Sequence, residues 1–330
     1  MIHAEMPAGG PVNPAERVRI GRTGVHVTRL GLGLAPIGGL YSPVSPSQAR
    51  ATVERAWQLG IRYFDVAPLY GNGLSERRAG PVLAAKPRDA FALSTKVGRL
   101  LRGGGSDRQS IWAEPGDGTP VFDFSSSGVR TSYAESLRRM GLDRADILHL
   151  HDPDEHFSQA VDAALPALAE LRREGRVGAV SAGMNQARML ADLVRTGSLD
   201  CVLEAGRYTL LDQSAEDELL PLCEKRGVSV IAAGVFNSGL LADPKPGASF
   251  DYAPAAASMV ERALAGEEIC RRHGVPLRAA AIQFPLRHPA VTSVLVGARS
   301  PAEVEDAVRM ASHPIPPRLW SDLRAAGLIR

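Results

Sequence analysis

The sequence predicts a single-domain (β/α)8 barrel, the TIM-barrel fold, because eight short apolar runs alternate with amphipathic segments along the chain. Each run has the length of a strand and ends at glycine or a polar residue. Strict alternation implies parallel strands with right-handed crossovers, and eight units in 330 residues favour a closed barrel over an open doubly wound sheet. The runs span residues 27–35, 61–67, 90–97, 145–151, 177–183, 200–206, 228–234 and 292–298.

Amphipathic segments between these runs predict the helices. In residues 45–60, Ser47 is the expected N-cap and Gly60 suits the C-terminal end. Similar patterns cover residues 128–141, 158–175 and 301–312. The glycines near the first strand lack the Gly-x-Gly-x-x-Gly spacing, so a Rossmann-type cofactor site is not expected.

The chain divides into a polar, flexible N-terminal segment, residues 1–16, and a barrel over residues 17–330. The longest irregular stretch is an insert at residues 98–128, which follows the third strand. Loops of this length are usually functional or disordered. In a barrel this insert would lie at the catalytic face.

Composition points to a small-molecule partner. Lys+Arg 38 against Asp+Glu 36 gives a net charge of only +2, so we expect no recruitment of nucleic acid or of an anionic membrane. The composition does not predict whether the chain is a monomer or an oligomer. The N-terminus resembles no signal peptide, and no apolar run approaches a membrane span. Cys201, Cys223 and Cys270 lack disulfide or zinc spacing, so we expect reduced core thiols, no metal site and a cytoplasmic location.

Four polar residues fall at the ends of predicted strands and should face one mouth of the barrel: Asp65, Tyr70, Lys96 and His151. A lysine ammonium near Tyr70 would lower the pKa of the phenol toward working pH, which suits proton transfer. Asp65 would hold Lys96, and the His151 imidazole would orient the reacting oxygen. His149 is expected one layer deeper rather than as a metal ligand.

The motifs around these residues resemble the aldo-keto reductase superfamily. They are FDVAPLYGNGLSE (64–76), STK (94–96), LHLHDP (148–153) and VLVGARSPAEVEDA (294–307). The resemblance runs from about Arg19 to Ser312 and implies that Asp65, Tyr70, Lys96 and His151 form a catalytic tetrad. Further segments, among them PVFDFSSSGV and VFNSGLL, look like the branch that contains L-fucose, D-threo-aldose and L-galactose dehydrogenases and pyridoxal 4-dehydrogenases.

This resemblance implies oxidation of the anomeric carbon of a cyclic aldose to a lactone, with hydride transfer to NAD. Pyridoxal, as its cyclic hemiacetal, is the alternative substrate. Reduction of aldehydes with NADPH and a non-catalytic cofactor-binding subunit are further alternatives.

The resemblance also implies cofactor contacts in three places. Ser181 and Asn185 lie near the expected nicotinamide site, although strand six offers Glu204 and Ala205 where glutamine is usual. The segment after strand seven suits the pyrophosphate and consists of Phe236, Asn237, Ser238, Gly239 and Leu240. Gly297, Arg299 and Glu303 follow strand eight; Glu303 stands where NADPH-dependent members have arginine, which favours NAD, while Arg299 leaves NADP possible.

Four residues are candidate substrate contacts. Trp112 and Phe124 offer aromatic area, Asp123 offers a carboxylate for hydroxyl groups, and Tyr41 follows the first strand. Simple loop packing is the alternative for each of them.

Overall fold

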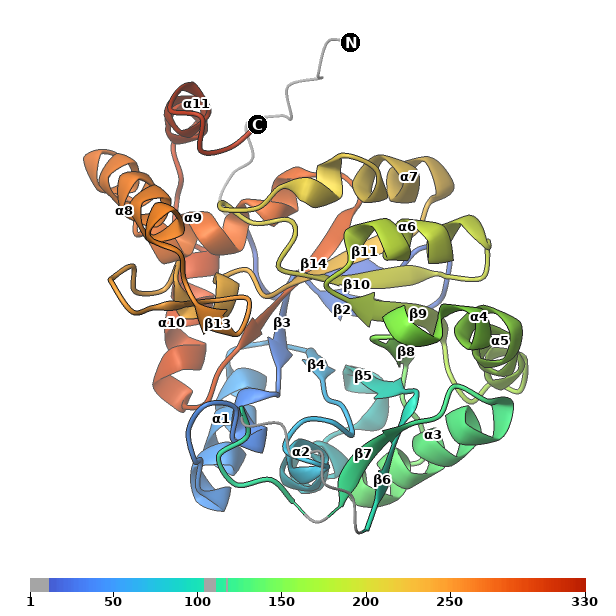
Figure 1. The fold of residues 1–330 in the computed structure, drawn as a ribbon. Coiled ribbons are helices and arrows are strands. Elements are labelled where there is room, and N and C mark those ends of the chain that lie inside the picture. Colours follow the sequence, from blue (N-terminus) through green and yellow to red (C-terminus); the bar gives the residue numbers. More distant parts are fainter. Residues whose placement is uncertain (1–11, 104–110, 117) are drawn as a thin grey trace.

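The computed structural model describes residues 12–103, 111–116 and 118–330. Within these ranges eight parallel strands close into a barrel in the order β10-β11-β14-β3-β4-β5-β8-β9 (Figure 1). The predicted fold is confirmed, and each predicted run overlaps one barrel strand. These strands are β3 (Leu30–Gly33), β4 (Tyr63–Asp65), β5 (Ala92–Val97), β8 (Ile147–His151), β9 (Ala179–Met184), β10 (Cys201–Ala205), β11 (Ser229–Ala233) and β14 (Val291–Gly297).

Helices surround the barrel (Figure 1). They are α1 (Pro46–Gln58), α2 (Leu74–Ala84), α3 (Ser126–Met140), α4 (Phe157–Gln159), α5 (Leu165–Arg173), α6 (Ala187–Arg195), α7 (Leu219–Arg226), α8 (Ala257–Arg272), α9 (Leu277–Gln283), α10 (Pro301–Ala311) and α11 (Pro317–Ala325). The predicted cap of α1 is wrong: Ser45, not Ser47, accepts the hydrogen bond from the Gln48 amide. Pro46 occupies the first helical position, where its missing N–H costs nothing, so the cap is the residue before it.

A short hairpin that the sequence did not reveal closes the amino end of the barrel. It pairs β1 (Arg17–Arg19) with β2 (His26–Thr28), and the predicted first strand had merged β2 with β3. Ile20 and Val27 are fully buried in the same cluster as the apolar residues of the barrel interior. The carboxyl end of the strands is therefore the end available for a site.

The insert after β5 is more regular than predicted. Its two ends form an antiparallel pair, β6 (Arg99–Arg102) with β7 (Thr119–Phe122). A single bridge between Leu40 and Trp112 ties the insert to the loop after β3. Residues 104–110 and 117 lie outside the described part of the chain. The described part of the insert, which follows β5, therefore also contacts the loop after β3 at the carboxyl end of the barrel.

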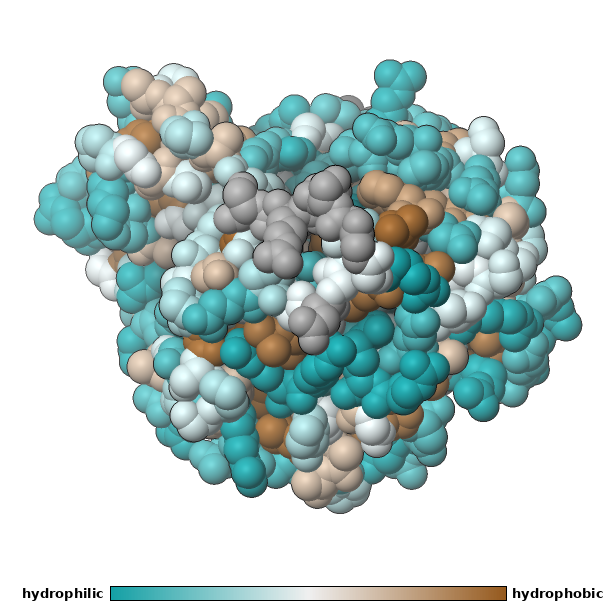
Figure 2. Space-filling model, turned by 60° about the horizontal axis from the view of Figure 1, so that its bottom comes forward, coloured by the Kyte–Doolittle hydropathy of each residue, from teal (hydrophilic) through white to brown (hydrophobic). Residues whose placement is uncertain are grey.

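Exposed aromatic and aliphatic side chains gather in loops at that same end. Among the described residues, the large hydrophobic side chains with the greatest exposure are Tyr41, Val121, Phe122, Tyr252 and Leu264. All but Leu264 lie in loops that follow barrel strands; Tyr252 is in the turn between β12 (Ser249–Phe250) and β13 (Ala253–Pro254). On the face shown in Figure 2, hydrophobic residues form small groups among hydrophilic ones.

None of the helices in the described ranges is long and apolar enough to cross a membrane. The three cysteines are free and buried, in agreement with the prediction of core thiols.

Candidate active site

Asp65 and Lys96 form a buried ion pair on neighbouring strands at the carboxyl end of the barrel. Asp65 is the last residue of β4 and aligns with Ser94 of β5, so Lys96 lies two residues further along the adjacent strand. Lys96 Nζ donates to Asp65 Oδ2 at 2.6 Å and to the Val66 carbonyl at 3.1 Å. Both side chains are only 2% exposed. Charges buried this deeply need partners, so each group fixes the other.

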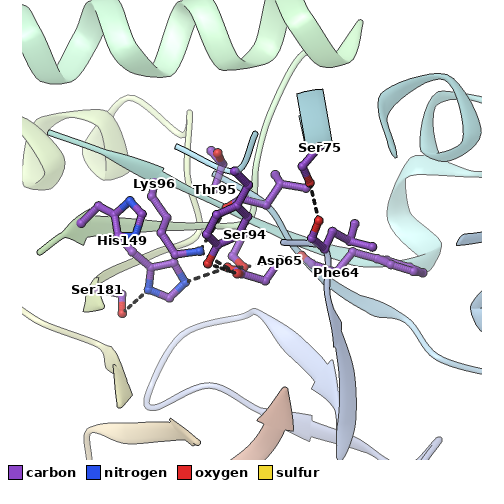
Figure 3. A network of polar contacts seen from close by, with 12 residues as sticks. Phe64, Asp65, Ser75, Ser94, Thr95, Lys96, His149 and Ser181 are labelled. Atoms are coloured by element: carbon purple, nitrogen blue, oxygen red, sulfur yellow. Dashed lines mark hydrogen bonds and ion pairs between the residues drawn. The ribbon is translucent and has the colours of Figure 1, made fainter. Parts of the chain in front are cut away.

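A second polar layer supports Asp65 from inside the barrel (Figure 3). Ser94 Oγ donates to Asp65 Oδ1 at 2.7 Å, and His149 Nε2 lies 3.8 Å from the same oxygen. His149 Nδ1 and Ser181 Oγ are 2.8 Å apart and hydrogen-bonded. Burial, with a smaller contribution from the charge of Lys96, lowers the pKa of His149 well below its usual value, so this imidazole is neutral. The predicted deeper position of His149 is confirmed.

Tyr70 reaches the ion pair from the loop after β4. Its hydroxyl donates to Asp65 Oδ2 at 3.4 Å, and Lys96 Nζ lies 4.5 Å from the centre of its ring. The loop takes this path because Gly71 has a positive φ of 59° and packs against the backbone of Gly38, where a side chain would collide. Tyr70 is thereby held over the centre of the barrel.

The expected pKa of Tyr70 is wrong in direction. Burial and the Asp65 carboxylate raise the pKa of Tyr70 well above that of a free phenol, with Tyr252 and Asp152 adding to the shift. The ammonium of Lys96 contacts the ring rather than the hydroxyl, and its charge is matched by Asp65. In this state Tyr70 is a neutral phenol that donates to a carboxylate.

His151 completes the group of four. It is the last residue of β8, is 7% exposed and lies against Tyr70, with 6.0 Å between ring centres. Burial and the charges of Arg99 and Lys96 lower the pKa of His151 well below its usual value, so the ring is neutral. The four predicted residues therefore meet at one end of the barrel, as their positions at strand ends indicated.

Two further charged residues lie beside His151, and the sequence prediction missed both. Asp152 Oδ2 is 3.6 Å from His151 Nε2 and accepts a hydrogen bond from Arg99 Nη2 at 2.7 Å. Arg99 is the first residue of β6 in the insert and is separated from the end of β5 by Gly98 alone. The only signal in the sequence was the carboxylate that directly follows His151.

Two of the four predicted substrate contacts lie at this site. Trp112 packs beside Tyr70, with 6.1 Å between ring centres, and is 7% exposed. Tyr41 is 45% exposed at the rim and lies 6.5 Å from Tyr252 across the mouth. Trp112 therefore packs directly beside Tyr70, whereas Tyr41 contacts Tyr252 at the exposed rim.

The other two, Asp123 and Phe124, make local packing and capping contacts, as the loop-packing alternative describes. Phe124 is fully buried and lies against Gly98, where even a single added carbon would collide with its ring. Asp123 Oδ1 accepts hydrogen bonds from the Ser125 amide at 3.0 Å and the Ser125 hydroxyl at 2.6 Å, and so braces the N-cap of α3. The ring of Phe124 is therefore enclosed by the protein, and one carboxylate oxygen of Asp123 is engaged by Ser125.

The residues expected near the nicotinamide differ in how deeply they are buried in the barrel. Ser181 is fully buried with His149, below the mouth, so its hydroxyl does not reach the site. Asn185 is partly exposed at the end of β9, and its Nδ2 donates to the Ala205 carbonyl at 2.7 Å. Glu204 is fully buried and accepts from the Arg207 amide, with its pKa raised by burial to about 8.

The loop after β11 has the features of a ligand-binding turn. Asn237 and Ser238 both have left-handed backbones, with φ of 46° and 57°. Asn237 is 3% exposed, and its Oδ1 is a buried acceptor without a hydrogen-bond partner among the described residues. Such an atom calls for a donor that the protein itself does not supply. This acceptor would suit a hydroxyl or amide donor rather than the pyrophosphate predicted for the segment, whose other members are Phe236, Gly239 and Leu240.

Arg299 and Glu303 lie after β14 and bind each other. Glu303 accepts from the Arg299 amide at 2.8 Å, and its other oxygen is 3.2 Å from Arg299 Nε. Arg299 Nη1 also donates to Ser42 Oγ at 3.0 Å. Gly297 is exposed at the strand end and aligns with Gly33 of β3. The guanidinium is therefore already paired with a carboxylate.

Comparison with known proteins agrees with this geometry. The Aldo/keto reductase family profile matches residues 29–327. The chain is 43% identical to a pyridoxal 4-dehydrogenase of Microbacterium luteolum, covering 96% of this chain and 98% of that one. It is 44% identical to a D-threo-aldose 1-dehydrogenase of a Pseudomonas species (93% and 96% covered) and 34% identical to an L-galactose dehydrogenase of Arabidopsis thaliana (88% and 86%). The chain therefore belongs to the aldo/keto reductase family of nicotinamide-dependent oxidoreductases.

Proposed function

We propose that this protein oxidises the anomeric carbon of a cyclic aldose to a lactone with NAD, and that Asp65, Tyr70, Lys96 and His151 carry the chemistry. The observation that carries this proposal is the contact of the Tyr70 hydroxyl with the buried Asp65–Lys96 pair, beside the neutral His151. Two of the relatives compared above are named as aldose dehydrogenases, which supports a sugar substrate.

Each residue has one task in the proposed reaction. Neutral His151 donates a hydrogen bond to the anomeric oxygen and orients it. Tyr70, once deprotonated, accepts the proton of the anomeric hydroxyl, while Asp65 and Lys96 fix the position of its hydroxyl and set its electrostatic environment. The oxidised nicotinamide, when bound, supplies the acceptor for the hydride that leaves C1. Loss of that hydride and of the hydroxyl proton converts the C1–O bond into the carbonyl of the lactone.

NAD is the proposed cofactor because Glu303 already neutralises Arg299. A phosphate on the adenosine ribose would have to compete with this carboxylate, whereas a free ribose hydroxyl can donate to it. The buried Oδ1 of Asn237 is a further acceptor for a cofactor hydroxyl or amide. Ser181 is left out of the proposed contacts because of its depth.

Pyridoxal is the second candidate substrate. It is supported by the 43% identical relative and by the aromatic wall, since Trp112 and Tyr70 present flat surfaces that suit a pyridine ring as well as a sugar face.

The test is NADH formation from L-fucose, L-galactose, D-arabinose and pyridoxal, with NAD and NADP in parallel. The Tyr70→Phe variant keeps the ring over Lys96 but removes the proton acceptor, so we expect kcat to fall by about 10²–10⁴-fold. Its affinity for NAD, measured by calorimetry, should not change.

Normal turnover by Tyr70→Phe would contradict the assignment of the four residues. Oxidation of pyridoxal alone would select the second candidate. Aldehyde reduction with NADPH that exceeds sugar oxidation would indicate a reductase, and cofactor binding without turnover on any substrate would indicate a binding subunit.

A further inference from the structure

Asp152 has an unusual backbone that directs it to the substrate side of His151. Its φ of 45° is left-handed, which a residue other than glycine adopts at a cost. Its amide donates to the Gly183 carbonyl at 3.1 Å, which fixes this conformation at the end of β9. As a result Asp152 Oδ2 lies 3.6 Å from His151 Nε2, although the two residues are adjacent in the chain.

Arg99 holds this carboxylate from the opposite side. Its side chain is 10% exposed, stacks on Phe122 with 4.4 Å to the ring centre, and donates to Asp152 Oδ2 at 2.7 Å. The Arg99 carbonyl accepts from Ser132 Oγ of α3 at 3.0 Å, so the backbone of Arg99 is anchored as well. Burial raises the pKa of Asp152, and the guanidinium of Arg99 opposes that shift.

Among the described residues, the contacts to the Asp152 side chain reach one of its two carboxylate oxygens. Both contacts above involve Oδ2, and Oδ1 receives no hydrogen bond from the described residues, while the side chain is 30% exposed. A carboxylate oxygen that is held in place and receives no hydrogen bond of its own is a strong acceptor for a hydroxyl group. The aromatic side chains of Tyr70 and Trp112 lie beside the same space.

The position of the Asp152 carboxylate beside His151 indicates which hydroxyl it would meet. The proposed substrate places its reacting oxygen at His151 Nε2. Oxygens on neighbouring carbons of a sugar ring are separated by about a hydrogen-bond distance, and the Asp152 carboxylate lies next to His151, with 3.6 Å between Oδ2 and His151 Nε2. The group nearest Asp152 is then the hydroxyl on the carbon next to the reacting one.

Resting on the proposed function, we propose that Asp152, positioned by Arg99, binds the hydroxyl adjacent to the anomeric carbon and selects hydroxylated aldoses over pyridoxal. An aldose offers a neutral hydroxyl that donates to the carboxylate. Pyridoxal has no hydroxyl on the carbon next to the reacting one. Its phenol lies one carbon further along the ring and is ionised near neutral pH, and Asp152 repels a phenolate.

The test measures sugar binding to the Tyr70→Phe variant saturated with NAD, in which turnover does not interfere. Calorimetry compares L-fucose with 2-deoxy-L-fucose, and we expect the deoxy sugar to bind about 10- to 100-fold more weakly. Adding Asp152→Ala should reduce that ratio to near one, and Asp152→Asn should give an intermediate ratio. Asp154→Asn is the matched control: this carboxylate lies in the same loop, accepts from Gln186 Nε2, and should leave the ratio unchanged.

The role of Arg99 is tested by the pH dependence of the same ratio. In Arg99→Met the carboxylate of Asp152 loses the cation that opposes protonation, so discrimination should disappear at a higher pH than in the parent. If Arg99 had a purely structural role, Arg99→Met would lower the affinity for both sugars without changing the pH at which discrimination disappears.

The outcomes separate the two proposals. If Asp152→Ala keeps its melting temperature and leaves the ratio of the affinities for L-fucose and 2-deoxy-L-fucose unchanged, the inference is overturned, even if the wild type oxidises L-fucose. Binding that depends on Asp152 without oxidation by the wild type would support the inference and contradict the proposed reaction. Absence of sugar binding would overturn both.

Discussion

The two halves of the barrel mouth are built differently. On β4, β5 and β8, the polar groups lie at strand ends, almost fully buried, and the Asp65–Lys96 contact bridges adjacent strands. The other half consists of loops, where left-handed turns such as Asn237–Ser238 and exposed rings such as Tyr252 form the wall. In the proposed reaction the first half holds the reacting atoms, with Asp152 and Arg99 at its edge, and the second half supplies the cofactor contacts. Variants should therefore affect stability and turnover together in the first half, and separately in the second.

The largest effect is expected for Lys96→Met. It leaves Asp65 charged and buried without its cation, so the free energy of unfolding should fall by about 3–5 kcal/mol, and kcat should fall by about 10²–10⁴-fold. Urea unfolding and steady-state kinetics measure the two quantities. The double variant Asp65→Asn/Lys96→Met removes both charges and should regain most of the stability but none of the activity. Recovery of activity in the double variant would refute the coupling.

The next effect is on pH dependence. Because burial and Asp65 raise the pKa of Tyr70, its base form is scarce near neutrality, and kcat/KM for oxidation should increase as pH rises through the alkaline range. The lowered pKa of His151 keeps this ring neutral, so its protonation should add no further loss as pH falls toward about 6. A profile that is flat up to about pH 10 would show that Tyr70 is not the group that accepts the proton. The residual rate of Tyr70→Phe should lack the alkaline rise.

The contrast between strand ends and loops also explains which site residues could be predicted from the sequence. Carboxyl ends of parallel strands meet at one place, so Asp65, Lys96 and His151 can be brought together from strand limits alone. Side-chain direction and local capping are not fixed by strand order. Asp123, a candidate substrate contact, supports the cap of α3, and Ser181 lies one layer deeper with His149. The role of Asp152 was not predicted because its orientation depends on a left-handed backbone, and the sequence alone does not show that this residue adopts one.

In the loop half, Glu303→Gln should change cofactor preference without loss of stability. The substitution removes the carboxylate charge from Arg299 and allows the guanidinium to meet a phosphate, so kcat/KM with NADP relative to NAD should rise by about tenfold. Parallel kinetics with the two cofactors measure this ratio. Arg299→Gln in the same background should abolish the gain, and a ratio unmoved by Glu303→Gln would mean that this pair does not contact the adenosine ribose.

The smallest effect separates a structural carboxylate from a substrate contact. Asp123→Ala removes two hydrogen bonds to Ser125 and should lower the free energy of unfolding by about 1 kcal/mol. Because the carboxylate is engaged with Ser125, KM for the sugar should not change, whereas Asp152→Ala should raise it. A rise in KM with Asp123→Ala at unchanged stability would return this residue to the substrate site. It would also show that the insert selects substrate through Asp123 as well as through Arg99.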